Sequence, residues 1–87
     1  MKIKDGFVIR QVGGEHVVVP VGERSKEFHG MINMNETGAF LWKFFTAEHT
    51  IEEGVDVLCA EYNVDRAVAE TDVNRFADIL QRNGFTE

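Results

Sequence analysis

The side chains that we consider as candidates for a nucleophile, a general base or a metal ligand are few, and they are dispersed along the chain. They are Ser25, Cys59 and the three histidines His16, His29 and His49. A nucleophile needs a base within hydrogen-bond reach and usually a third group that orients it. None of these residues belongs to a motif of that kind. We therefore predict no catalytic residue and no enzymatic activity in the chain alone.

The same residues give no sign of a metal or cofactor site. The histidines form no H-x-H or H-x-x-x-H pair, and a single cysteine excludes both a disulfide framework and a zinc cluster of cysteines. The glycines form no phosphate-binding loop. An acyl carrier needs a serine at the start of a helix, whereas Ser25 lies in a charged link between predicted strands. We predict neither metal nor cofactor.

Charge and length limit the remaining classes of function. Residues 35–87 contain eleven of the fifteen acidic residues and four of the nine basic ones, so there is no cationic cluster for phosphates and we predict no nucleic-acid partner. We find neither an apolar run near 18 residues nor a signal peptide, and we therefore expect a cytoplasmic protein without a membrane partner. Its 87 residues suffice for one domain over residues 1–87.

The first third of the sequence predicts strands. Residues Gly6–Val12 and Glu15–Val21 are rich in β-branched side chains, and Gly13 and Gly14 between them are typical of a two-residue hairpin turn. After a polar link, Phe28–Met34 alternates between two sides in the manner of a third strand.

The remainder predicts three helices. Asn35 is a favoured N-cap for a helix from about Glu36 to about Phe45. Thr50 and Glu53 have the spacing of a capping box at the start of a second helix. Asp65 could cap a third helix that ends at Asn83 and Gly84. The order predicts an α+β fold, a three-stranded antiparallel sheet followed by three helices, similar to a winged helix-turn-helix.

The third strand and the third helix offer a binding surface. Phe28–Met34 contains none of the charged residues or prolines that normally protect an exposed sheet edge. On the third helix, a face wider than a core stripe requires comprises Ala69, Asp72, Val73, Phe76 and Leu80. An extended peptide could add to the strand and place its side chains against this helix. The alternatives are a covered edge and a helix face that only packs on the first helix.

The residues from Met31 to Trp42 resemble the hallmark of the PqqD family, in which an apolar residue precedes N-x-T-G-A and an aromatic pair. Further segments match the family pattern in order: Thr50–Glu53, Tyr62–Asp65, Asp72–Val73 and Leu80–Phe85. The resemblance covers nearly the whole chain.

This resemblance implies a recognition element for ribosomally synthesised and post-translationally modified peptides (RiPPs). Such an element binds the leader of a precursor peptide as an added strand and presents it to a modifying enzyme, often a radical SAM enzyme. Carried over by position, the peptide-binding residues are Phe28, His29, Gly30, Met31, Ile32, Asn33, Met34, Ala69, Asp72, Val73, Arg75 and Phe76. Asn35 and Gly38 are interpreted as structural, the first as a cap and the second as a close-packing residue.

Two other functions stay open at this point. A winged-helix regulatory or DNA-binding protein would use the third helix for recognition, but its arginines alternate with acidic residues. A homodimeric adaptor would pair two copies of the third strand across a two-fold axis.

Overall fold

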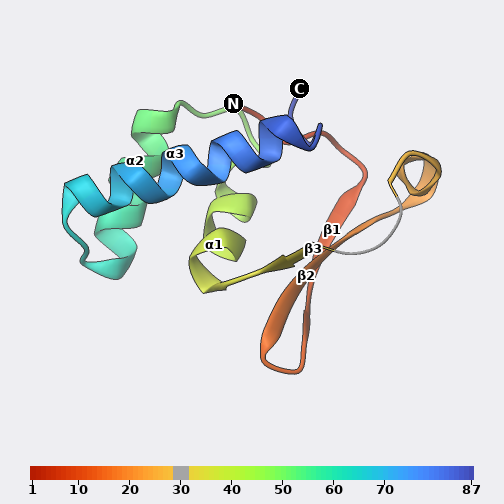
Figure 1. Ribbon diagram of the computed structural model, residues 1–87, viewed down its shortest axis with the longest axis horizontal. Coiled ribbons are helices and arrows are strands. Elements are labelled where there is room, and N and C mark those ends of the chain that lie inside the picture. The colour runs from red at the N-terminus through yellow and green to blue at the C-terminus, as the bar shows by residue number, and fades with distance from the viewer. Residues whose placement is uncertain (29–31) are drawn as a thin grey trace.

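The computed structural model describes residues 1–28 and 32–87. Three strands precede three α-helices, which confirms the predicted α+β fold: β1 (Phe7–Val12), β2 (Glu15–Pro20), β3 (Ile32–Met34), α1 (Glu36–Phe44), α2 (Ile51–Tyr62) and α3 (Arg66–Arg82). A short 3₁₀ helix, η1 (Gly22–Lys26), follows β2. Figure 1 shows the α-helices gathered on one side of the sheet, while the β1–β2 hairpin projects away from them.

The sheet is an antiparallel meander in the order β1-β2-β3. The hairpin turns at Gly13 and Gly14, and Gly13 has φ +63°, a conformation that glycine adopts at little cost. The register pairs Ile9 with Val18 and Val18 with Ile32. Because directly opposite residues lie on the same face, these three side chains share the sheet face that packs against the helices.

Two helix starts follow the predicted capping chemistry. The side chain of Asn35 accepts a hydrogen bond from the backbone N–H of Gly38 at 2.8 Å. Thr50 and Glu53 form the complete capping box at the start of α2. Asp65 lies at the N-cap of α3, but its side chain makes no capping hydrogen bond, so the prediction that it caps α3 was right in position only.

The core lies between the inner sheet face and the three helices. Its largest fully buried side chains are Trp42, Phe45, Leu41, Leu58 and Leu80. Segments from the two ends of the chain meet here: Ile3 pairs with Thr86 in an isolated bridge, and Lys4 donates a backbone hydrogen bond to Phe85 at 2.8 Å. Within residues 1–28 and 32–87, no helix is both long and apolar enough to cross a membrane.

The polar link and the third strand differ from their predictions. The link forms η1 because Glu27 and Phe28 donate backbone hydrogen bonds to the carbonyl of Arg24, at 3.0 Å in each case. Phe28 directly follows η1 and is not in a strand. Residues Ile32–Met34 confirm the C-terminal part of the predicted strand, and residues 29–31 lie outside the described part of the structure.

Candidate peptide-binding edge and cleft

Strand β3 lies at one edge of the sheet. It pairs with β2 on one side, and no strand in the described part of the chain pairs with its other side. Ile32, Asn33 and Met34 include no charged residue or proline that would block an added strand. The backbone on this side of β3 can therefore accept a further strand.

A cleft of about 190 Å³ lies between the start of α1 and α3, and we call it the α3 cleft. It begins at Asn35, directly after β3. The lining residues are Asn35, Thr37, Gly38, Leu41, Asp72, Arg75, Phe76 and Ile79. A peptide that follows the free edge of β3 would thus reach side chains of α3.

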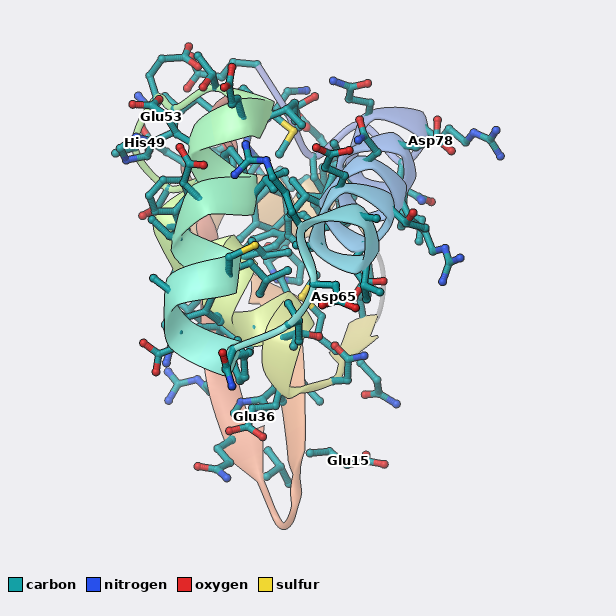
Figure 2. All side chains as sticks on the ribbon, turned by 90° about the vertical axis from the view of Figure 1, so that its left-hand side faces the viewer. Glu15, Glu36, His49, Glu53, Asp65 and Asp78 are labelled. Atoms are coloured by element: carbon teal, nitrogen blue, oxygen red, sulfur yellow. The ribbon has the colours of Figure 1, made fainter. Side chains whose placement is uncertain are left out.

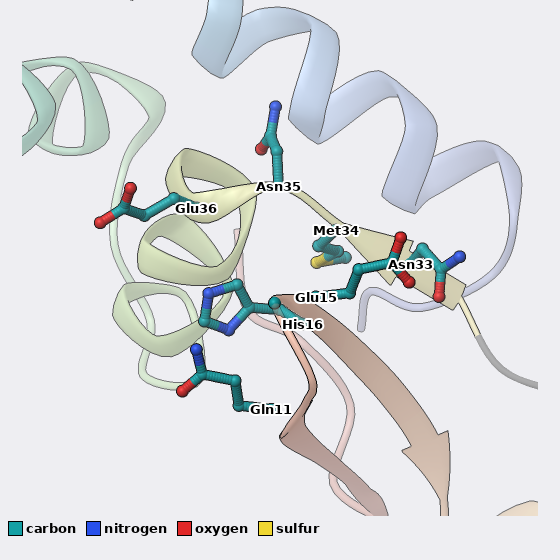
Figure 3. Close-up of a pocket in the computed structure, with 8 residues that line it drawn as sticks. Gln11, Glu15, His16, Asn33, Met34, Asn35 and Glu36 are labelled. Atoms are coloured by element: carbon teal, nitrogen blue, oxygen red, sulfur yellow. The ribbon is translucent and has the colours of Figure 1, made fainter.

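The α1 side of the cleft is ordered by hydrogen bonds to Asn35. Its Oδ1 atom accepts from the Gly38 backbone N–H and, at 3.1 Å, from the Thr37 hydroxyl. Figure 3 shows the Asn35 side chain extending toward α3, with its amide nitrogen at the tip. Asn35 therefore caps α1 and presents an amide to the cleft, whereas the sequence predicted a structural role alone.

The α3 side combines an apolar surface with two opposite charges. Phe76 is half-buried and stacks on Phe45 with ring centroids 6.3 Å apart, while Ile79 is 49% exposed. Asp72 and Arg75 line the same cleft, and neither forms an ion pair with any other described residue. The cleft can thus bind an apolar side chain and also a polar or charged group.

A second pocket of about 190 Å³ lies at the other end of β3, around Phe28. The ring of Phe28 packs between Phe7 and Phe85, with centroid distances of 5.0 and 5.1 Å. The pocket is lined by Phe7, Val18, Pro20, Phe28, Ile32, Asn83 and Phe85. Phe28 was predicted to bind peptide as part of a strand, but in the structure its ring lines this pocket next to β3.

The structure brings together only part of the predicted site. Asp72, Arg75 and Phe76 line the α3 cleft, and Ile32–Met34 form the edge beside it. Ala69 and Val73 are 0% exposed and belong to the core, which corrects their predicted place in the groove. The predicted residues His29, Gly30 and Met31 lie outside the described residues.

The sequence reasoning missed Ile79 and Thr37. Ile79 is three residues after Phe76 and seven after Asp72, so the three share one face of α3. This spacing was visible in the sequence as an isoleucine outside the core stripe. Thr37 had no such signal, because its place depends on the turn from β3 into α1.

Three of the side chains considered for catalysis make contacts within the fold. The Ser25 hydroxyl donates to the Gly22 carbonyl at 2.6 Å, and Cys59 packs against the core. His49 stacks on Phe44 at 3.9 Å, with its Nδ1 3.5 Å from Glu53 Oε1, and Figure 2 shows His49 and Glu53 side by side.

Comparison with known proteins identifies the family. The sequence matches the family described as coenzyme PQQ synthesis protein D (PqqD) over residues 15–85. This chain belongs to the PqqD family. The match spans all six main elements except β1, and it confirms the resemblance noted in the sequence. No curated protein matches the chain.

A solved structure shares this PqqD-type fold. It is TbiB1 in complex with the TbiA(beta) leader peptide, at 29% sequence identity and a TM-score of 0.75. The match covers 100% of this chain and 95% of the TbiB1 chain. A PqqD-type chain with an open β3 edge is thus similar over its full length to a protein solved with a leader peptide.

Proposed function

We propose that this protein is a RiPP recognition element, which binds the leader of a ribosomally made precursor peptide by strand addition at β3. The open edge of β3 next to the α3 cleft is the observation that carries the proposal. Membership of the PqqD family and similarity to TbiB1 in its leader complex support it.

In this mechanism the backbone and the side chains have different tasks. Strand addition satisfies free N–H and C=O groups of β3 and is tolerant of sequence. Specificity then comes from side chains that enter the α3 cleft, where Phe76 and Ile79 offer apolar contact and Asp72 and Arg75 offer polar contact. A few such anchors carry most of the binding energy in interfaces of this kind.

We propose further that residues 1–87 act as a single recognition domain and that the catalytic step belongs to a separate modifying enzyme. The PqqD resemblance favours a radical SAM enzyme as the modifying enzyme. The recognition domain would hold the leader while the core of the same peptide enters the enzyme.

Titration of the ¹⁵N-labelled protein with a synthetic leader peptide tests the proposal, and a scrambled leader is the control. The expected result is saturable shifts of the backbone amides in β3 and of the residues that line the α3 cleft. Shifts confined to α2, or equal binding of both peptides, would overturn strand addition at β3. Self-association through β3 without leader would instead support the homodimeric adaptor.

The DNA-binding alternative gains no support from α3. Arg66 pairs with Asp56 at 2.7 Å and with Glu70 at 3.5 Å, and Arg82 pairs with Asp78 at 3.0 Å. Because two of its three arginines already have carboxylate partners, α3 is a poor helix for contacting phosphates.

A further inference from the structure

The sheet has a second face, which points away from the core. The register pairs Val8 with Val19, Arg10 with Val17, and Val17 with Asn33. Figure 3 shows Glu15 and Asn33 extending to one side of the sheet, opposite to His16 and Gln11. We define the outer face as Val8, Arg10, Val12, Glu15, Val17, Val19 and Asn33.

Of the four valines on this outer face, Val17 is buried and the other three are at least partly exposed. All four are absent from the core cluster and from the side chains packed against it. Val17 is 6% exposed, between its cross-strand neighbours Arg10 and Asn33, whereas Val12 is 62% exposed. The three α-helices lie on the other side of the sheet (Figure 1). The face therefore offers mainly Val12, and Val8 and Val19 in part, to a molecule that approaches it.

The charges on the outer face favour a partner with a carboxylate. Arg10 is exposed midway along the edge strand β1 and pairs with no carboxylate in the described ranges, while Glu15 lies at the hairpin end. A guanidinium next to partly exposed valines interacts well with an acidic group that arrives within an apolar surface.

The size of the face argues against a second copy as its occupant. Three strands at about 4.8 Å spacing and up to six residues at about 3.3 Å give roughly 300 Å². A stable complex buries about 800 Å² on each partner. The face alone is too small for this, so its occupant must be held by an additional connection.

A bound leader supplies such a connection in two ways. An added strand beside β3 extends the sheet, and every second side chain of the leader then joins the outer face. The core of the same peptide extends into the enzyme, which raises the enzyme's effective concentration at this face to the order of millimolar. A small contact surface is sufficient under these conditions.

We propose that the outer face is the docking surface for the modifying enzyme, which contributes an apolar patch with a carboxylate opposite Arg10. This inference rests on the proposed function, because the bound leader completes the surface. The enzyme consequently binds the leader-loaded protein more tightly than the free protein, and by linkage it also strengthens leader binding.

The test uses the purified peptide-modifying enzyme of the same gene cluster with three forms of the full chain. These are the wild type, the double variant Arg10→Glu/Val12→Ser, and the control Val68→Ser. Val68 is an exposed valine, 50% accessible, on α3 and away from the outer face. Leader affinity is measured without enzyme by fluorescence anisotropy, and enzyme affinity is measured with each form at saturating leader.

The expected result is unchanged leader affinity in all three forms and a loss of enzyme affinity of about tenfold or more in the double variant alone. Equal enzyme affinity for the double variant and the wild type would overturn the docking surface while leaving leader recognition intact. Failure of the wild type to bind leader would instead overturn the proposed function. Trp42 fluorescence in a thermal melt verifies that each variant is folded.

Discussion

Ile79 is the side chain of the α3 cleft whose removal discriminates best between binding and folding. It is 49% exposed, so a substitution affects the core little, but a peptide in the cleft would cover it. We predict that Ile79→Ser weakens leader binding by about 1–2 kcal/mol, or about five- to thirtyfold, because apolar surface is no longer buried. Isothermal titration with the leader measures this.

Val68→Ser is the matched control for Ile79→Ser. Both residues are exposed aliphatic side chains on α3, and Val68 lies outside the cleft. We expect the control to bind leader as the wild type does. If both variants bind equally well, the α3 cleft is not where the peptide side chains lie.

At the residue scale, helical periodicity explains which site predictions were right. Ala69, Val73, Ala77 and Leu80 form the stripe of α3 that is buried in the core. Asp72, Phe76 and Ile79 lie on a neighbouring stripe. Each of them is one position before a residue of the buried stripe, which corresponds to a rotation of about 100° around the helix axis. The sequence shows an apolar stripe on α3 with Phe76 and Ile79 near its margin, but where the core ends and the cleft begins depends on how α1 and α2 pack.

At the scale of elements, α2 packs closely because position 54 is a glycine. A Cβ added at Gly54 would lie 2.7 Å from the ring of Phe45 and 3.2 Å from a methyl group of Val73. We predict that Gly54→Ala lowers the free energy of unfolding by about 1–2 kcal/mol, since overpacking outweighs the gain of about 1 kcal/mol in helix propensity. Urea denaturation measures it.

Ala60→Ser, on the exposed side of the same helix, provides the comparison for Gly54→Ala. Its expected effect is below about 0.5 kcal/mol, as is usual for surface positions. A Gly54→Ala variant that is more stable than the wild type would show that Phe45 moves aside at no cost.

The capping box of α2 should make stability depend on pH. The hydrogen bond from the Thr50 backbone N–H to Glu53 lowers the pKa of this carboxyl below its ordinary value of 4.5. A lowered folded-state pKa means that the contribution to stability is present above the unfolded pKa and is lost as the pH falls through the folded pKa. We predict that Glu53→Gln reduces the loss of stability below about pH 4.5, as measured by thermal melts between pH 3 and 7.

Glu48 is a second carboxyl whose pKa is lowered in the folded protein. Its pKa is lowered by the hydrogen bond from the Met1 amino group, so it contributes to stability with the same sign. The double variant Glu53→Gln/Glu48→Gln should therefore have a flatter acid profile than either single variant. Identical profiles for Glu53→Gln and the wild type would refute the role of the capping box.

Elements were predicted well where a local signal exists. The double glycine, the capping box and Asn35 act within a few residues, and the hairpin and the starts of α1 and α2 follow them. The predicted start of β3 at Phe28 was wrong. The alternating pattern of the sequence extends to Phe28, but the backbone N–H of this residue bonds to Arg24 in the turn that follows η1, so Phe28 is not in the strand. Its ring is fixed by Phe7 and Phe85, which are distant in sequence.

At the scale of the whole molecule, Phe85 joins segments from the entire chain. It is 3% exposed, and its ring contacts those of Phe7, Phe28 and Trp42 at 4.9–5.7 Å. Figure 1 shows the two marked ends of the chain close together beside this region. No local pattern of the sequence indicates this junction, because its partners are separated by up to 78 residues.

We predict that Phe85→Ala destabilises the protein by about 3–5 kcal/mol, a large part of the 5–15 kcal/mol typical of a small domain. Phe40→Ala is the control. Phe40 is half-buried, and its one aromatic contact in the described residues is with Tyr62 at 5.5 Å. Urea unfolding followed by the fluorescence of Trp42 measures both. A similar cost for both variants would mean that Phe85 only fills space locally; a larger cost for Phe85→Ala would show that this one ring holds the sheet, α1 and the C-terminal segment together beside the proposed peptide-binding edge.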